Sequence, residues 1–161
     1  MGTFITRQPN GLLCRFSTVV DCITHYNMTE EEYIVSMVSV LEVDKMKESD
    51  GIIIGSPVHY ASAAGAITSF MDRVSYSGGF ALSYKPGAAV VSCRRGGASA
   101  AFDQLNKYFT ILNMPIVSSN YWNMVHGNTP EDVLKDEEGV QTMRILGRNM
   151  AWLIKAIDNF D

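Results

Sequence analysis

Three short segments of the chain concentrate the residue types that contact ligands. They lie at residues 56–62, 93–97 and 118–127, and together they hold most of the chain's glycine, arginine, histidine and tryptophan chemistry. Glycine lets another molecule approach the backbone closely because it has no side chain, and Pro57 fixes the φ angle of its turn. Whether the segments form one site depends on the elements that position them.

Each segment follows, or begins within, a run of residues typical of a buried parallel strand. Residues 51–55 and 88–92 are short, apolar and partly β-branched, and a shorter run lies at 115–118. Amphipathic patterns that predict helices begin after Ser62, a candidate N-cap, and after Gly97. Their apolar faces consist of Ile67, Phe70, Met71 and Val74 in the first helix, and of Phe102, Leu105, Phe109 and Leu112 in the second.

Two more helices are predicted towards the C-terminus. Residues 129–132 (Thr-Pro-Glu-Asp) have the N-cap, the proline and the acidic first turn typical of a helix start. The last helix repeats residues of its core-facing stripe at steps of three and four, namely Val140, Met143, Gly147, Met150, Ile154 and Ile157, with Trp152 off the stripe.

Strands that alternate with helices indicate an α/β fold, with a parallel sheet covered on both faces. Because crossovers between parallel strands are right-handed, the three segments are expected on one edge of the sheet. Open α/β sheets bind their ligands at that edge. This convergence is the strongest functional signal that the residues carry by themselves.

Residues 1–36 do not follow the alternating pattern. The apolar runs at 3–6 and 12–16 flank Arg-Gln-Pro-Asn-Gly and predict an antiparallel hairpin, because too few residues separate them for a helical crossover. Thr29 opens a capping-box pattern that predicts a helix extending towards Ser49. We therefore expect an atypical N-terminal segment at 1–36 and one α/β domain at 37–161.

Composition narrows the function classes. The 161 residues carry a net charge of −4 and no run of lysine or arginine, which argues against nucleic-acid or anionic-membrane binding. No apolar stretch approaches the roughly 20 residues of a membrane span, and no signal peptide is evident, so a cytoplasmic location is expected. The cysteines Cys14, Cys22 and Cys93 predict neither a disulfide framework nor a metal site.

Residues 38–159 resemble the flavodoxin-like NAD(P)H-dependent FMN reductases, in particular the branch related to iron–sulfur flavoproteins. The resemblance rests on Gly-Ser-Pro-Val-His-Tyr at 55–60, Met-Asp-Arg at 71–73, Ser-Cys-Arg-Arg-Gly-Gly at 92–97 and Tyr-Trp-Asn-Met-Val-His-Gly at 121–127. The Asp-Glu-Glu-Gly helix start at 136–139 agrees as well.

This resemblance implies a flavodoxin-like three-layer sandwich with a parallel sheet. It also implies FMN as cofactor, NAD(P)H as co-substrate, and a quinone, nitro compound or similar small molecule as electron acceptor; it names no catalytic residue. The implied cofactor-binding residues are Ser56, Pro57, Val58, His59, Tyr60, Ser62, Ser92, Cys93, Arg94, Arg95, Gly96, Gly97, Tyr121, Trp122, Asn123, His126 and Gly127.

The N-terminal segment departs from the family pattern. Family members open with a strand and a phosphate-binding loop, which residues 1–36 do not resemble, so the first βαβ unit is atypical or missing. Cys14 and Cys22 do not reproduce the clustered cysteines of the iron–sulfur branch. An unpaired strand at 51–55 must be covered or pair with another chain, which favours a homo-oligomer. We also expect weaker FMN binding than is usual in the family.

Several structural interpretations stay open beside the functional ones. Residues 56–62 can be an ordinary strand-to-helix loop, and Arg94 and Arg95 can be surface charges. Cys93 can be a reactive thiol or, the favoured interpretation, a small buried residue. Tyr121 and Trp122 can form a wall of the flavin pocket or a dimer contact. The alternative for the whole chain is a non-catalytic flavodoxin-like module for partner binding or self-association.

Overall fold

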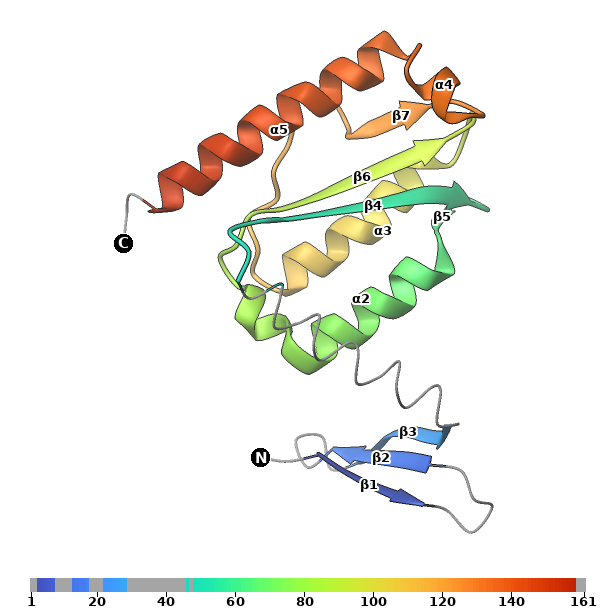
Figure 1. Cartoon of the computed structure of the whole chain (residues 1–161), viewed down its shortest axis with the longest axis vertical. Coiled ribbons are helices and arrows are strands. Elements are labelled where there is room, and N and C mark those ends of the chain that lie inside the picture. Colours follow the sequence, from blue (N-terminus) through green and yellow to red (C-terminus); the bar gives the residue numbers. More distant parts are fainter. Residues whose placement is uncertain (1–2, 8–12, 18–21, 29–45, 47, 159–161) are drawn as a thin grey trace. The chain divides into compact units, whose positions relative to one another are not determined.

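A computed structural model of the chain (Figure 1) describes residues 3–7, 13–17, 22–28, 46 and 48–158. The chain divides into two compact units, Met1–Glu42 and Val43–Asp161.

The first unit contains a three-stranded antiparallel sheet. Strands β1 (Thr3–Arg7), β2 (Leu13–Ser17) and β3 (Cys22–Met28) lie in the order β1-β2-β3, and Thr3 pairs with Ser17 in the first hairpin. The predicted hairpin is therefore confirmed, whereas β3 was not predicted. The helix predicted from Thr29 towards Ser49 lies mostly outside the described residues. Within the described part of that range, only Met46 is helical.

The second unit is an α/β sandwich. Its elements are β4 (Ile52–His59), β5 (Ser62–Ala63), α2 (Gly65–Gly78), the 3-10 helix η1 (Gly79–Leu82), β6 (Gly87–Cys93), α3 (Ala98–Ile111), β7 (Met124–His126), α4 (Pro130–Val133) and α5 (Glu137–Asp158). The sheet order is β5-β4-β6-β7. Strands β4, β6 and β7 are parallel, and β5 is antiparallel to β4. The predicted α/β class with a parallel sheet is confirmed.

Strand β6 separates two cores because its side chains alternate between the sheet faces. Ala89 and Val91 pack in the larger core with buried residues of α2 and α3, such as Met71 and Phe109. Ala88 belongs to the second core, which includes Leu146 and Met150 of α5. Helices α2 and α3 thus cover one face of the sheet and α5 covers the other (Figure 1).

Strand β4 is buried on one face only, which corrects the prediction of a fully buried strand. Ile52 and Ile54 are buried against the larger core, but Ile53 is 54% exposed on the opposite face. Within the described residues, the only strand beside β4 other than β6 is β5, which pairs with Val58 and His59. Residues 52–57 therefore form an edge of this described sheet.

The third strand lies later in the sequence than predicted. Around residues 115–118 there is only one bridge, in which Val117 N donates to Gly87 O at 2.8 Å; the strand itself, β7, begins at Met124. Between them, buried Asn123 bonds to β6 in two ways: its side-chain Nδ2 donates to Ala89 O at 3.1 Å, and its backbone carbonyl accepts from Val91 N at 3.0 Å. The third strand is thus interrupted by residues 118–122 rather than followed by them.

Two details of the helices differ from the prediction. Helix α2 begins after Ala64 rather than at Ser62, because the Ser62 hydroxyl lies 2.8 Å from Gln104 Oε1 and its residue belongs to β5. The buried face of α5 is centred on Thr142, Leu146 and Met150, and Gly147 of the predicted stripe is exposed. The apolar period was right, but part of the stripe was assigned one residue too late.

Helices α2 and α3 are joined by a hydrogen bond in which the Tyr108 hydroxyl donates to Asp72 Oδ1 at 2.5 Å. Burial, together with the hydrogen bond and the negative charge of Asp72, raises the pKa of Tyr108 to about 12. The folded state therefore favours the neutral phenol. This contribution is complete below the unfolded value near pH 10 and is lost as the pH rises towards 12.

We expect Tyr108→Phe to lower the free energy of unfolding by about 1 kcal/mol at neutral pH, because one hydrogen bond is removed. Urea unfolding from pH 8 to 12 measures this, and the difference between wild type and variant should shrink above pH 10. Tyr76→Phe, at an exposed position of α2, is the control. A difference that stays constant up to pH 12 would contradict the assignment.

Candidate functional site

The three parallel strands end at one edge of the sheet, at His59, Cys93 and His126 (Figure 1). Residues 56–62 and 93–97 lie at this edge, as predicted. The third segment differs, because residues 124–126 form β7 and only the interruption before them is a loop. All three segments nevertheless meet near the carboxyl ends of the strands.

The first segment is the end of β4 and a tight turn into β5, not the predicted loop. Tyr60 and Ala61 have φ angles of 51° and 58°, a left-handed conformation that L residues seldom adopt in succession. Buried Ser56 holds this turn from within, since its hydroxyl donates to Pro57 O at 2.8 Å and accepts from Ala64 N at 2.9 Å. The turn leaves the Tyr60 side chain fully exposed at the edge.

The second segment packs directly against that turn. Gly97 has a φ of +86° and precedes α3 as its N-cap. A Cβ at this position would lie 2.7 Å from Ala61 Cα, so the two loops approach more closely than a side chain would permit. Arg94, Arg95 and Gly96 are exposed, and no side chain caps the first turn of α3. Backbone N–H groups of that turn are thus free of a side-chain cap beside the two arginines.

The third segment places two exposed aromatic rings on the other side of this loop. The ring centroids of Tyr121 and Trp122 are 5.3 Å apart, with the ring planes tilted by 53°. The Ser119 hydroxyl lies within 2.7 Å of both Tyr121 O and Asn123 Oδ1, so it stabilises the loop at 118–122 that carries the two rings.

A cavity of about 460 Å³ lies between the second and third segments and the start of α5. This volume is typical of small-molecule sites. Of the sequence-predicted residues, the cavity brings together Arg95, Gly96, Gly97, Tyr121, Trp122 and His126. The other lining residues are Ala98, Ser99, Met124, Asp136, Glu138, Gly139 and Thr142.

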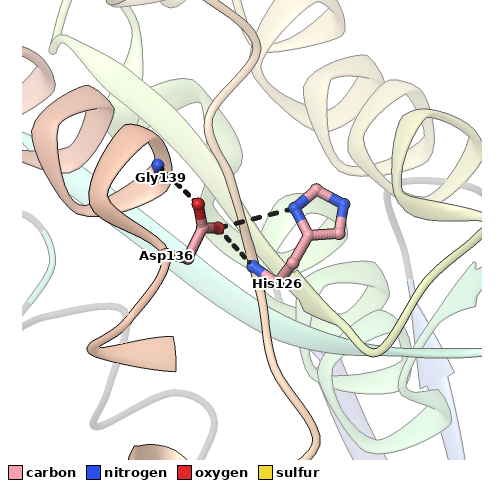
Figure 2. Close-up of polar contacts among 3 residues, drawn as sticks. All are labelled: His126, Asp136 and Gly139. Carbon is pink, nitrogen blue, oxygen red and sulfur yellow. Dashed lines mark hydrogen bonds and ion pairs between the residues drawn. The ribbon is translucent and has the colours of Figure 1, made fainter. Parts of the chain in front are cut away.

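Asp136 connects β7 to α5 at the cavity wall (Figure 2). Its Oδ1 accepts from Gly139 N at 3.0 Å, and its Oδ2 accepts from His126 N at 2.7 Å and lies 3.5 Å from His126 Nδ1. The hydrogen bond from Gly139 N–H is the largest influence on the pKa of Asp136 and lowers it; burial opposes this effect, and each contact with His126 lowers the pKa by a smaller amount. The carboxylate therefore stays ionised at neutral pH.

The sequence marked Asp136 only as part of a helix start, and its position beside His126 was not predicted. An aspartate three residues before Gly139 is an N-cap signal. The contact with His126, ten residues earlier, depends on how α5 packs beside β7. Glu138 and Thr142 follow on the same helix and were likewise missed.

The remaining predicted residues lie outside the cavity. Cys93 is buried in the larger core, and burial raises the pKa of its thiol, which favours the structural interpretation. Asn123 is committed to the sheet, Ser92 is half-buried within β6, and Gly127 packs against Val133 of α4. The first-segment residues do not line the cavity either; these are Ser56, Pro57, Val58, His59, Tyr60 and Ser62, together with Arg94 of the second segment.

Among the described residues, no group of three or more histidine, cysteine, aspartate or glutamate side chains is arranged to hold a metal ion. None of the helices described is both long and apolar enough to cross a membrane.

Comparison with solved structures defines the fold class. The chain aligns with the flavodoxin-like WrbA-like protein from Agrobacterium tumefaciens at a TM-score of 0.53 and 15% identity, covering 76% of this chain and 74% of that chain. It aligns with the apo NADH:FMN oxidoreductase EMOB at 0.55 and 19%, covering 74% and 59%. The fold is therefore flavodoxin-like, as the sequence resemblance implied.

The chain belongs to the NADPH-dependent FMN reductase family, whose model matches residues 21–129. It is 34% identical over 141 residues to an iron–sulfur flavoprotein of Methanocaldococcus jannaschii, covering 81% of this chain and 73% of the relative. An iron–sulfur flavoprotein of Archaeoglobus fulgidus is 26% identical, and the alignment spans 73% of this chain and 65% of that protein. The family match begins at residue 21, whereas the motifs that carry the sequence resemblance begin only after residue 38. Family membership makes the chain a flavin-dependent oxidoreductase.

Proposed function

We propose that the chain binds FMN at the carboxyl edge of its sheet and passes electrons from NAD(P)H to a small acceptor. The observation that carries the proposal is the position of residues 94–97. On one side this loop packs against the strained Tyr60–Ala61 turn, and on the other it lines the cavity beside Tyr121 and Trp122. A flat ring on this loop has the turn on one side and room for a second substrate on the other.

The residues of this edge suit a flavin. Gly96 and Gly97 let a ring approach the backbone, and the first turn of α3 offers N–H donors without a side-chain cap. Arg94 and Arg95 supply positive charge for the anionic reduced ring. We assign the flavin contacts to residues 56–60 and 62, to the loop at 94–97, and to Tyr121 and Trp122. When bound, FMN would supply the hydride chemistry, and these residues would supply binding, orientation and electrostatics.

The phosphate group of FMN is the part of the cofactor for which the chain offers the fewest recognisable contacts. A phosphate is usually held by backbone N–H groups at a helix N-terminus, and the family's phosphate loop has no sequence counterpart in residues 1–36. We therefore expect weaker FMN binding than is usual in the family, unless a second subunit completes the site. Sub-micromolar affinity in a demonstrated monomer would contradict this expectation.

Titration of the full chain with FMN, followed by flavin fluorescence, tests the proposal together with an NADPH oxidation assay. We expect saturable binding and flavin-dependent oxidation. Arg95→Gln should weaken FMN binding about tenfold, because a charge-assisted contact contributes about 1.4 kcal/mol or more. Lys107→Gln removes the same charge at an exposed position of α3 and should leave the affinity unchanged. A folded chain with neither binding nor oxidation would favour the non-catalytic module instead.

A further inference from the structure

His126 and Asp136 form a pair at the cavity wall to which the proposed flavin contacts assign no chemistry. His126 ends β7 and Asp136 directly precedes α5, so both are held by regular elements. The His126 side chain is 46% exposed and Nδ1 lies 3.5 Å from Asp136 Oδ2 (Figure 2). Nδ1 faces the carboxylate, while Nε2 is the ring nitrogen that points away from it.

The carboxylate of this pair is fixed more firmly than an ordinary surface aspartate. Each oxygen accepts a backbone N–H, from Gly139 on one side and from His126 on the other. A Cβ at residue 139 would collide with Asp136 Oδ2, so glycine is needed for the carboxylate to lie there. Asp136 is therefore a rigid, ionised acceptor directed at one nitrogen of the imidazole.

The rest of the cavity suits a planar aromatic molecule with polar edges. Tyr121, Trp122 and Met124 supply aromatic and apolar surface, and Arg95 and His126 supply hydrogen-bond donors. Glu138 is the remaining ionisable side chain on the wall besides Asp136 and Tyr121. Among the acceptor classes that the family resemblance implies, a quinone combines a flat ring with carbonyl oxygens that accept hydrogen bonds.

We propose that His126 donates a proton to a quinone bound in this cavity, and that Asp136 is the positioning residue that orients its ring. The inference rests on the proposed function. The quinone gains a hydride from the reduced flavin, which is oxidised, and a proton from the His126 imidazolium at a carbonyl oxygen, giving the hydroquinone. Solvent returns a proton to the partly exposed imidazole. Proton transfer by a positioned side chain contributes about 100-fold or more to such a step.

The pairing is tested without flavin by NMR of the imidazole nitrogens of the full chain, at a pH where His126 is neutral. Asp136 should hold the ring proton on Nδ1, whereas histidine in peptides favours Nε2. Asp136→Asn, which still offers one oxygen to cap α5, should move the proton to Nε2; His126→Gln identifies the signals. An unchanged tautomer in Asp136→Asn would overturn the positioning role.

The proton transfer is tested with two acceptors on the FMN-loaded, reduced protein. Menadione needs a proton for each hydride, whereas ferricyanide takes electrons alone. We expect His126→Gln to slow menadione reduction about 100-fold and to change ferricyanide reduction less than twofold. Lys135→Gln, next to Asp136 but paired with Asp132 outside the cavity, is the control and should change neither rate.

The two arms separate the inference from the proposed function. Equal losses with both acceptors, or no loss with menadione, would overturn the role of His126. If the wild-type protein failed to reduce even ferricyanide, this result would contradict the proposed function and therefore also the proton-transfer step. The tautomer measurement would still decide whether Asp136 positions the ring.

Discussion

Gly97→Ala is expected to lower the free energy of unfolding by about 2–3 kcal/mol and to weaken FMN binding at least about tenfold. The left-handed backbone at this position costs a non-glycine residue about 1–2 kcal/mol. The new Cβ would also lie 2.7 Å from Ala61 Cα, which is backbone and cannot rotate away. The loop and the turn must separate, which disturbs both sides of the proposed flavin site.

Urea unfolding and FMN titration measure the two effects, and Gly96→Ala is the matched control for stability. A Cβ at residue 96 meets nothing within 4 Å, so this variant should unfold within about 0.5 kcal/mol of wild type. Equal stability of the Gly96 and Gly97 variants would show that the close approach of the loops is not needed.

Asn123→Ala is the second substitution with a large expected effect, a loss of about 2–4 kcal/mol of unfolding free energy. The buried amide donates to Ala89 O inside the sheet, and its removal leaves that carbonyl without this donor and opens a cavity. Thermal and urea unfolding measure the loss. Asn120→Ala, at an exposed position of the neighbouring loop at 118–122, should change the free energy of unfolding by less than about 0.5 kcal/mol.

An Asn123→Ala variant that is as stable as wild type but loses FMN affinity would return Asn123 to the flavin contacts predicted from the sequence. We expect the opposite order, in which the loss of stability comes first and any loss of binding follows from it.

The periodic parts of the fold could be predicted from the sequence because burial leaves a local pattern. The apolar faces of α2 and α3, and the runs that became β4 and β6, follow from spacing alone. The prediction of a strand at 115–118 was wrong, because the β-branched pair Ile116–Val117 has the same sequence pattern whether it forms a ladder or a single bridge. The Asn123 side chain donates a hydrogen bond to Ala89 O in the neighbouring strand, and no local sequence pattern predicts such a contact.

The candidate site was predicted in part for the same reason. Topology placed residues 56–62 and 93–97 at one edge, and Gly97 touches the turn of the first segment as that placement requires. The start of α5 was missed as a cavity wall because its contribution depends on how a distant helix packs beside β7. Asp136 carried a helix-start signal, but nothing in its sequence neighbourhood indicated His126 as its partner.

The most direct test of the account is an FMN titration of the full chain followed by its backbone amide NMR signals. We expect the largest chemical-shift changes at the Tyr60–Ala61 turn, at residues 94–97 and at residues 121–126. The signals of the C-terminal half of α5 should stay unchanged. Shifts confined to the C-terminal half of α5, or no shifts at saturating FMN, would contradict a flavin site at the carboxyl edge of the sheet.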